Sequence, residues 1–78
     1  MEAIEVTVKF DQSGNIRPLS FIRKGISHPV DSIGRQWEDN TGRHYLVMVP
    51  IERIFELLFV PIELRWYMRK EGPDRIMA

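Results

Sequence analysis

The segment Ile4-Glu5-Val6-Thr7-Val8-Lys9-Phe10 decides the fold, because its apolar and polar side chains alternate strictly. This period of two is typical of a β-strand that buries one face and exposes the other. Five turn-forming residues follow at 11–15, so the chain is predicted to return as an antiparallel strand over Ile16–Arg23. Pro18 has no N–H for a ladder, which places this strand at a sheet edge or lets it join the sheet only after Pro18.

Further turn signals divide the middle of the chain. Lys24-Gly25 predicts a tight hairpin, since glycine tolerates the positive φ that such turns need. Residues 26–37 contain His28-Pro29 and a Ser-Ile-Gly sequence that bend a strand, so we expect one long kinked strand or two short ones. A third turn at 38–42 leads into a strand over Arg43–Val49 whose two faces are both predicted to be partly covered.

Residues 51–60 fit two structures. Their apolar spacing suits a helix that opens after Pro50, but the segment is short and rich in β-formers, so a strand is preferred. A turn at 61–63 then gives a last strand over Leu64–Arg69. The prediction is an all-β fold, an antiparallel meander of five or six short strands curled into a small, partly open barrel. Its predicted core comprises Val6, Val8, Phe21, Trp37, Val47, Phe55, Leu57 and Trp66.

Composition sets the outer limits. The chain has 78 residues, 44% hydrophobic and 28% charged, which predicts a single domain 1–78 with a core over about 3–70 and a frayed tail at 71–78. No cysteine is present, which excludes disulfides and thiolate chemistry, and eleven basic residues balance eleven acidic ones. A neutral chain has no global field to attract nucleic acid or an anionic membrane. The absence of a long apolar stretch and of a signal-peptide pattern predicts a cytoplasmic protein with no membrane contact.

The residues that carry chemistry do not form a known pattern. His28 and His44 lack metal-ligand spacing, no serine lies in a nucleophile motif, and the glycines stand singly at turns rather than in a phosphate-binding loop. We therefore predict no enzyme activity, no metal, no cofactor and no small-molecule ligand. A deep pocket that gathers His28 or His44 with two carboxylates would contradict this prediction.

Two kinds of binding surface remain. Arginine interleaved with aromatic residues suits nucleic acid, because guanidinium pairs with phosphate and rings stack on bases; the candidate contacts are Arg23, Lys24, Tyr45, Arg65, Tyr67, Arg69 and Lys70. An apolar run that so small a core is not expected to cover suits protein contact, and homodimerisation would bury it. The candidate protein interface is Leu58, Phe59, Val60 and Ile62. Charge neutrality favours protein contact, above all self-association.

The chain from Arg17 to Arg69 also carries an ordered series of short motifs: Pro18-Leu19-Ser20-Phe21-Ile22-Arg23-Lys24-Gly25, Val30, Arg35-Gln36-Trp37, Arg43-His44-Tyr45, Phe55-Glu56-Leu57 and Arg65-Trp66-Tyr67-Met68. Their order resembles a group of short, functionally uncharacterised bacterial domains. Similar segments look like the C-terminal tails of polymerase-like translesion DNA repair proteins. The resemblance implies an accessory role near DNA repair, and it supplies no catalytic residue.

Overall fold

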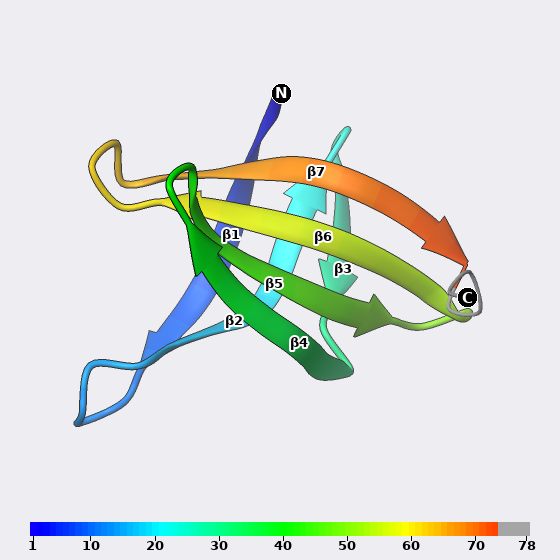
Figure 1. Cartoon of the computed structure of the whole chain (residues 1–78). Coiled ribbons are helices and arrows are strands. Elements are labelled where there is room, and N and C mark those ends of the chain that lie inside the picture. Colours follow the sequence, from blue (N-terminus) through cyan, green and yellow to red (C-terminus); the bar gives the residue numbers. More distant parts are fainter. Residues whose placement is uncertain (74–78) are drawn as a thin grey trace.

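The computed structural model describes residues 1–73, and in them seven strands form one antiparallel sheet with the order β3-β2-β1-β7-β6-β5-β4 (Figure 1). The strands are β1 (Glu2–Phe10), β2 (Ile16–Arg23), β3 (Ile26–Pro29), β4 (Ser32–Asp39), β5 (Gly42–Val49), β6 (Arg53–Val60) and β7 (Arg65–Pro73). The described residues contain no helix. The all-β antiparallel prediction is confirmed, whereas the predicted count of five or six strands is too low.

The hairpin turns lie where the turn signals predicted them. Lys24 and Gly25 have φ values of 52° and 77°, and the flanking Arg23 and Ile26 pair directly, as expected for a two-residue turn with two positive φ angles. The turn after β1 is held by the carboxylate of Asp11, which accepts the backbone N–H groups of Ser13 at 2.8 Å and Asn15 at 2.9 Å.

The additional strands arise because the chain bends between β3 and β4. The Val30 N–H donates to the Leu19 carbonyl of β2 at 2.9 Å, and the next N–H, of Asp31, donates to the Met48 carbonyl of β5 at 2.7 Å. Residues 26–39 thus pair with β2 at one end and with β5 at the other. This bend joins the two edges of the sheet and curls it into a partly open barrel (Figure 1). Of the two structures expected for this stretch, two short strands is correct.

Pro18 explains a local opening in the sheet. It lies opposite Val8, where the register between β1 and β2 shifts, and β3 pairs only with the Ser20–Arg23 half of β2. The strand β2 lies between β3 and β1 and joins the sheet at Ile16, before Pro18, so both positions expected for it are wrong. Pro18 nevertheless lies in the part of β2 that has no partner on the β3 side. A residue without an N–H is tolerated there because no ladder bond is lost.

Residues 53–60 form a strand, so the preferred reading of that segment is confirmed. Five predicted core residues are buried and two more are partly buried against them: Phe21, Val47, Phe55, Leu57 and Trp66, with Val6 and Val8. Trp37 was wrongly assigned to the core. It pairs with His44 and lies on the outer face of the sheet, because Tyr45, Val47 and Val49 take the inner positions of β5.

The two ends of the chain frame the described structure. The strand β7 continues to Pro73, three residues into the segment that was expected to fray at 71–78, and residues 74–78 lie outside the described residues. Among residues 1–73, no helix is long and apolar enough to cross a membrane.

Candidate interaction surfaces

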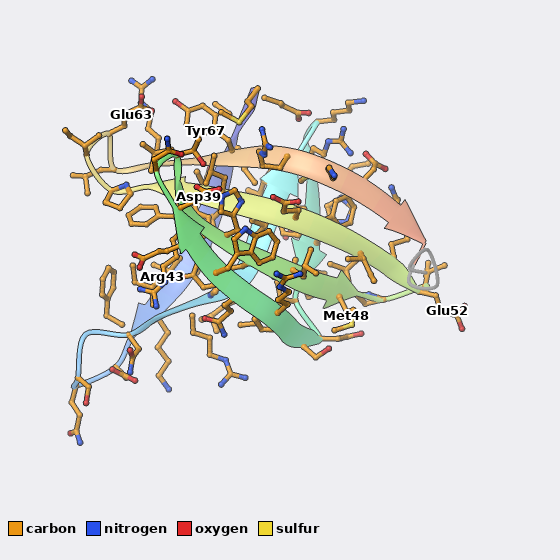
Figure 2. All side chains as sticks on the ribbon, viewed as in Figure 1. Asp39, Arg43, Met48, Glu52, Glu63 and Tyr67 are labelled. Atoms are coloured by element: carbon orange, nitrogen blue, oxygen red, sulfur yellow. The ribbon has the colours of Figure 1, made fainter. Side chains whose placement is uncertain are left out.

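A buried histidine network occupies the outer face of the sheet. His44 is 2% exposed; its Nδ1 lies 2.8 Å from Oε2 of Glu56, and its Nε2 lies 3.0 Å from Oδ1 of Asp39, which Figure 2 labels near the β4–β5 turn. An ionised carboxylate only accepts hydrogen bonds. Both contacts are therefore satisfied together when both ring nitrogens carry hydrogens. The network ties the β4–β5 turn to β6.

Trp37 covers this histidine from solvent. The two rings are 4.8 Å apart between centroids and 2° from parallel, and the guanidinium of Arg35 lies 4.9 Å from the centre of the indole. The stack follows from the hairpin register, which places Trp37 directly opposite His44. Sequence reasoning missed the network: Trp37 opposes His44 because the turn is Asn40-Thr41, whereas counting outward from the predicted turn at 38–42 pairs Trp37 with Arg43.

The network does not have the geometry of a hydrolytic triad. Thr41 Oγ1 is 3.3 Å from His44 Nε2, but the same hydroxyl lies 2.5 Å from Asp39 Oδ1 and donates its proton there. A base that activates a nucleophile must receive that proton itself. His44 does gather two carboxylates, yet it lies beneath Trp37, and among residues 1–73 the hollows beside Ile16, Leu64 and Pro61 are lined by other side chains. Within residues 1–73, no group of three or more potential ligands is placed to hold a metal ion.

Acid should weaken the part of this network that depends on Asp39. Hydrogen bonds from the Thr41 hydroxyl and then from His44 hold the pKa of Asp39 well below its ordinary value of 3.8. A depressed carboxyl pKa stabilises the folded state above the unfolded pKa, and the stabilisation is lost as the pH falls towards the folded pKa. We therefore expect Asp39→Asn to lower the Tm at pH 7, with the difference from the parent shrinking below about pH 4.

Thermal unfolding across pH 2.5–7 measures this, with Asp31→Asn as the matched control. Asp31 lies at the β3–β4 bend, and its carboxylate has no hydrogen-bond or ion-pair partner among residues 1–73. A Tm difference for Asp39→Asn that stays constant from pH 7 to pH 2.5 would contradict the expected role of its ionised form.

A second charged cluster closes one end of the barrel. Arg23 pairs with Glu2 at 3.2 Å and with Glu71, and Glu71 also pairs with Arg53. The ring of His28 stacks on Phe21 beside this cluster, at 5.0 Å between centroids. Burial, then the charges of Arg53 and Arg23, lower the pKa of His28. These ion pairs join β1, β2, β6 and β7, so their charges are largely used within the molecule.

The structure separates the residues predicted to contact nucleic acid. Tyr45 is 1% exposed in the core, so its assignment to a base-stacking surface is wrong. Arg23 and Arg69 each face a carboxylate, the latter 3.7 Å from Glu56, and the Tyr67 hydroxyl donates to Glu63, its neighbour in Figure 2. The three that remain, Lys24, Arg65 and Lys70, are exposed.

The residues predicted to contact protein differ in their exposure to solvent. Leu58 is fully buried on the outer face, so it cannot belong to an interface, and Phe59 and Val60 are half-buried. Ile62 is 93% exposed, and Leu64, which was expected to begin the last strand, is 81% exposed in the β6–β7 loop. Leu64 was missed because it was assigned to a strand rather than to the loop.

Known proteins add no assignment to these surfaces. The chain matches no protein-family model, and neither a curated protein nor a solved structure matches it. The resemblance to repair-protein tails therefore stays a prediction.

Proposed function

We propose that this chain is a non-enzymatic β-module that binds protein through its β6–β7 loop, with a second copy of itself as the partner. One observation carries the proposal. The loop presents Ile62 at 93% and Leu64 at 81% exposure, although both are large aliphatic side chains. Exposed aliphatic side chains that lie together favour association, because each one buried recovers about 1.5 to 3 kcal/mol of transfer free energy.

The loop is an ordered turn. The N–H of Leu64 donates to the Val60 carbonyl at 3.0 Å, the N–H of Glu63 donates to the same oxygen at 3.1 Å, and Leu64 has a φ of 56°. These hydrogen bonds order the backbone of the loop before a partner arrives, which reduces the backbone entropy lost on binding.

A hollow beside the loop could receive a side chain from the loop of a second copy. Its volume is about 390 Å³, and its lining includes Ile4, Val6, Leu64 and Trp66. A projecting Ile62 and a hollow lined in part by apolar side chains on one surface suit a two-fold dimer, in which each copy supplies both parts. The alternative partner, nucleic acid, is less well supported because Arg23 and Arg69 are already paired with carboxylates.

Sedimentation of the pure protein tests the proposal. We expect a concentration-dependent dimer that the double variant Ile62→Ser with Leu64→Asn converts to a monomer. Asparagine is chosen at 64 because it tolerates the left-handed backbone found there. The matched control is Ile51→Asn, an equally exposed residue of the β5–β6 turn with a φ of 71°. That turn, marked by Glu52 in Figure 2, lies at the opposite end of the sheet from Glu63.

The same preparation is titrated with single-stranded and duplex oligonucleotides at low salt. The proposal predicts no binding whose affinity falls steeply with salt. A protein that stays monomeric at high concentration and binds DNA with a steep salt slope would replace self-association by the nucleic-acid function. In that case each neutralised exposed cation, for example in Arg65→Gln, should reduce the slope by about one.

A further inference from the structure

The barrel has a gap with an unpaired strand edge on each side. Residues 16–18 of β2 have no neighbour on the side where β3 and Val30 pair with residues 19–23, and β4 has no neighbour on the side away from β5. A groove of about 530 Å³ lies between them, within the range of pockets that hold ligands. It is lined by Asp11, Asn15, Ile16, Arg17, Asp31, Ser32, Ile33, Gln36 and Arg43.

The groove is bordered by backbone groups that lack partners in the sheet. In an antiparallel strand, alternate residues direct their N–H and C=O groups to each side. The register of β4 is irregular between Ile33 and Gln36, so this alternation holds on either side of that point, where the strand offers donors and acceptors toward the groove. A strand edge of this kind is a template for one more extended chain.

Two arginines that line the groove, Arg17 and Arg43, are not paired with a carboxylate among the described residues. Within the described residues, Arg17 and Arg43 have no carboxylate within 4.0 Å, as is also true of Arg35 and Arg65, whereas Arg23, Arg53 and Arg69 are paired with at least one. Figure 2 labels Arg43 on the flank of the barrel that carries this groove. Guanidinium groups without partners attract carboxylates and pair with them in a specific geometry.

Two carboxylates, Asp11 and Asp31, also line the groove, and neither lies within 4.0 Å of the guanidinium of Arg17 or Arg43. The oxygens of Asp11 accept from Ser13 N–H and from the backbone and side-chain amides of Asn15, whereas the carboxylate of Asp31 has no hydrogen-bond or ion-pair partner among residues 1–73. The oxygens of Asp11 thus accept hydrogen bonds from within its own turn. The groove is left with hydrogen-bond donors that an acidic group could satisfy.

Apolar side chains complete the surface. Ile16 and Ile33 are half-buried in the groove wall, and Phe10, directly opposite Ile16 at the end of β1, is 63% exposed. Phe10 lies on the β1–β2 hairpin, which projects beyond the start of β7 (Figure 1). An exposed aromatic ring beside two aliphatic residues is a common anchor for a bound peptide.

We propose that this groove binds an extended segment of a partner protein in which aliphatic and acidic side chains alternate. The segment adds as a strand along β4, its carboxylates meet Arg17 and Arg43, and its aliphatic side chains pack on Ile16, Ile33 and Phe10. A second copy of this chain is the poorer occupant, because the β1–β2 hairpin, which carries Asp11 to Arg17, forms the opposite wall of the groove. This site is separate from the β6–β7 loop and does not rest on the proposed function.

The probe is a fluorescent eight-residue peptide that alternates valine and glutamate, titrated into the full-length chain. Binding should shift the amide resonances of Ser32–Asp39 in NMR spectra, because strand addition acts on the β4 backbone. Two comparison peptides separate the parts of the proposal. One carries lysine in place of glutamate, and the other carries N-methyl groups at alternate residues, which removes the ladder donors. We expect each to bind at least tenfold more weakly.

Variants on the protein side use matched arginines. Arg43→Gln and Arg17→Gln should each raise the Kd of the glutamate peptide about tenfold, the equivalent of about 1.4 kcal/mol. The control Arg35→Gln removes an exposed arginine of β4 that lies over Trp37 and outside the groove, so it should leave the Kd unchanged. Absence of binding, equal binding of the lysine peptide, or resonance shifts confined to the β6–β7 loop would overturn the proposal.

Discussion

Replacing Trp66 by alanine is expected to lower the free energy of unfolding by about 3 to 5 kcal/mol. Trp66 is 8% exposed on the inner face of β7, with its ring 5.4 Å from that of Tyr45 and 5.0 Å from that of Phe59 between centroids. Its removal leaves a cavity between β5, β6 and β7. A chain of 78 residues has a total stability of about 4 to 12 kcal/mol, so this single change threatens folding at 25 °C.

Denaturant titration followed by far-UV circular dichroism measures the loss. If Trp66→Ala does not fold, Trp66→Phe should fold with an intermediate loss, because it keeps an aromatic ring between Tyr45 and Phe59. Lys70→Ala is the control in the same strand, where an exposed side chain predicts a change within about 0.5 kcal/mol. A loss below about 1 kcal/mol for Trp66→Ala would mean that the ring does not support the core.

Most of the architecture could be predicted from the sequence because strand signals are local. Alternation in residues 4–10 and the turn formers that follow specify the first hairpin without reference to the rest of the chain. The strand over residues 53–60 followed from its short length and its β-formers, despite a competing helical spacing. Residues predicted to point inward do so in strands with one clearly apolar face, as Val6 and Val8 do in β1.

The number of strands could not be predicted because it depends on barrel closure. Residues 26–39 are divided into two strands because the N–H of Val30 bonds to β2 and the N–H of Asp31 bonds to β5. Which strand each N–H meets is fixed by the curl of the whole sheet, and no local pattern encodes that curl. The signals for a bend at Pro29 and Gly34 were present, but the division into β3 and β4 was not decided by them.

Trp37 shows where composition misleads. A tryptophan in a small β-domain is usually assigned to the core. Here the inner positions of β5 are taken by Tyr45 and its alternate neighbours, so the hairpin register places Trp37 outside, on His44. Tyr45 was misassigned for the same reason: it was expected on an exposed surface, but the register places it inside the barrel, where it is buried.

The candidate surfaces were harder to predict than the fold. Ile62 was identified from its apolar run, but Leu58 in the same run is buried because His44 and Tyr67 flank it across the sheet. The groove beside Arg43 could not be foreseen, because its walls come from β2 and β4, which meet only when the barrel curls. Surface sites on a sheet depend on register and curvature, and both are properties of the complete fold.

Gly42→Ala is expected to lower the free energy of unfolding by about 2 to 4 kcal/mol, although it adds one methyl group. Gly42 has a φ of 150°, and a Cβ there would lie 2.4 Å from the carbonyl oxygen of Phe59 and 3.0 Å from Cδ1 of Leu58. The obstacle is backbone, which cannot rotate away like a side chain. The methyl group must therefore separate β5 from β6 where the two strands begin to pair, next to His44.

Gly14→Ala is the control that isolates this contact, because Gly14 has a φ of 85° with nothing within 4 Å of its added Cβ. Both variants bear the cost of placing alanine at positive φ, so Gly14→Ala should lose only about 1 kcal/mol, and the excess in Gly42→Ala measures the clash with β6. Spreading of the strands should also loosen the stack of Trp37 on His44, which is 4.8 Å between centroids, and change the tryptophan fluorescence of the folded protein. Equal losses in the two variants would show that β5 yields at Gly42 without cost, and that the ladder from Arg43 onward, rather than close approach at the turn, holds these strands together.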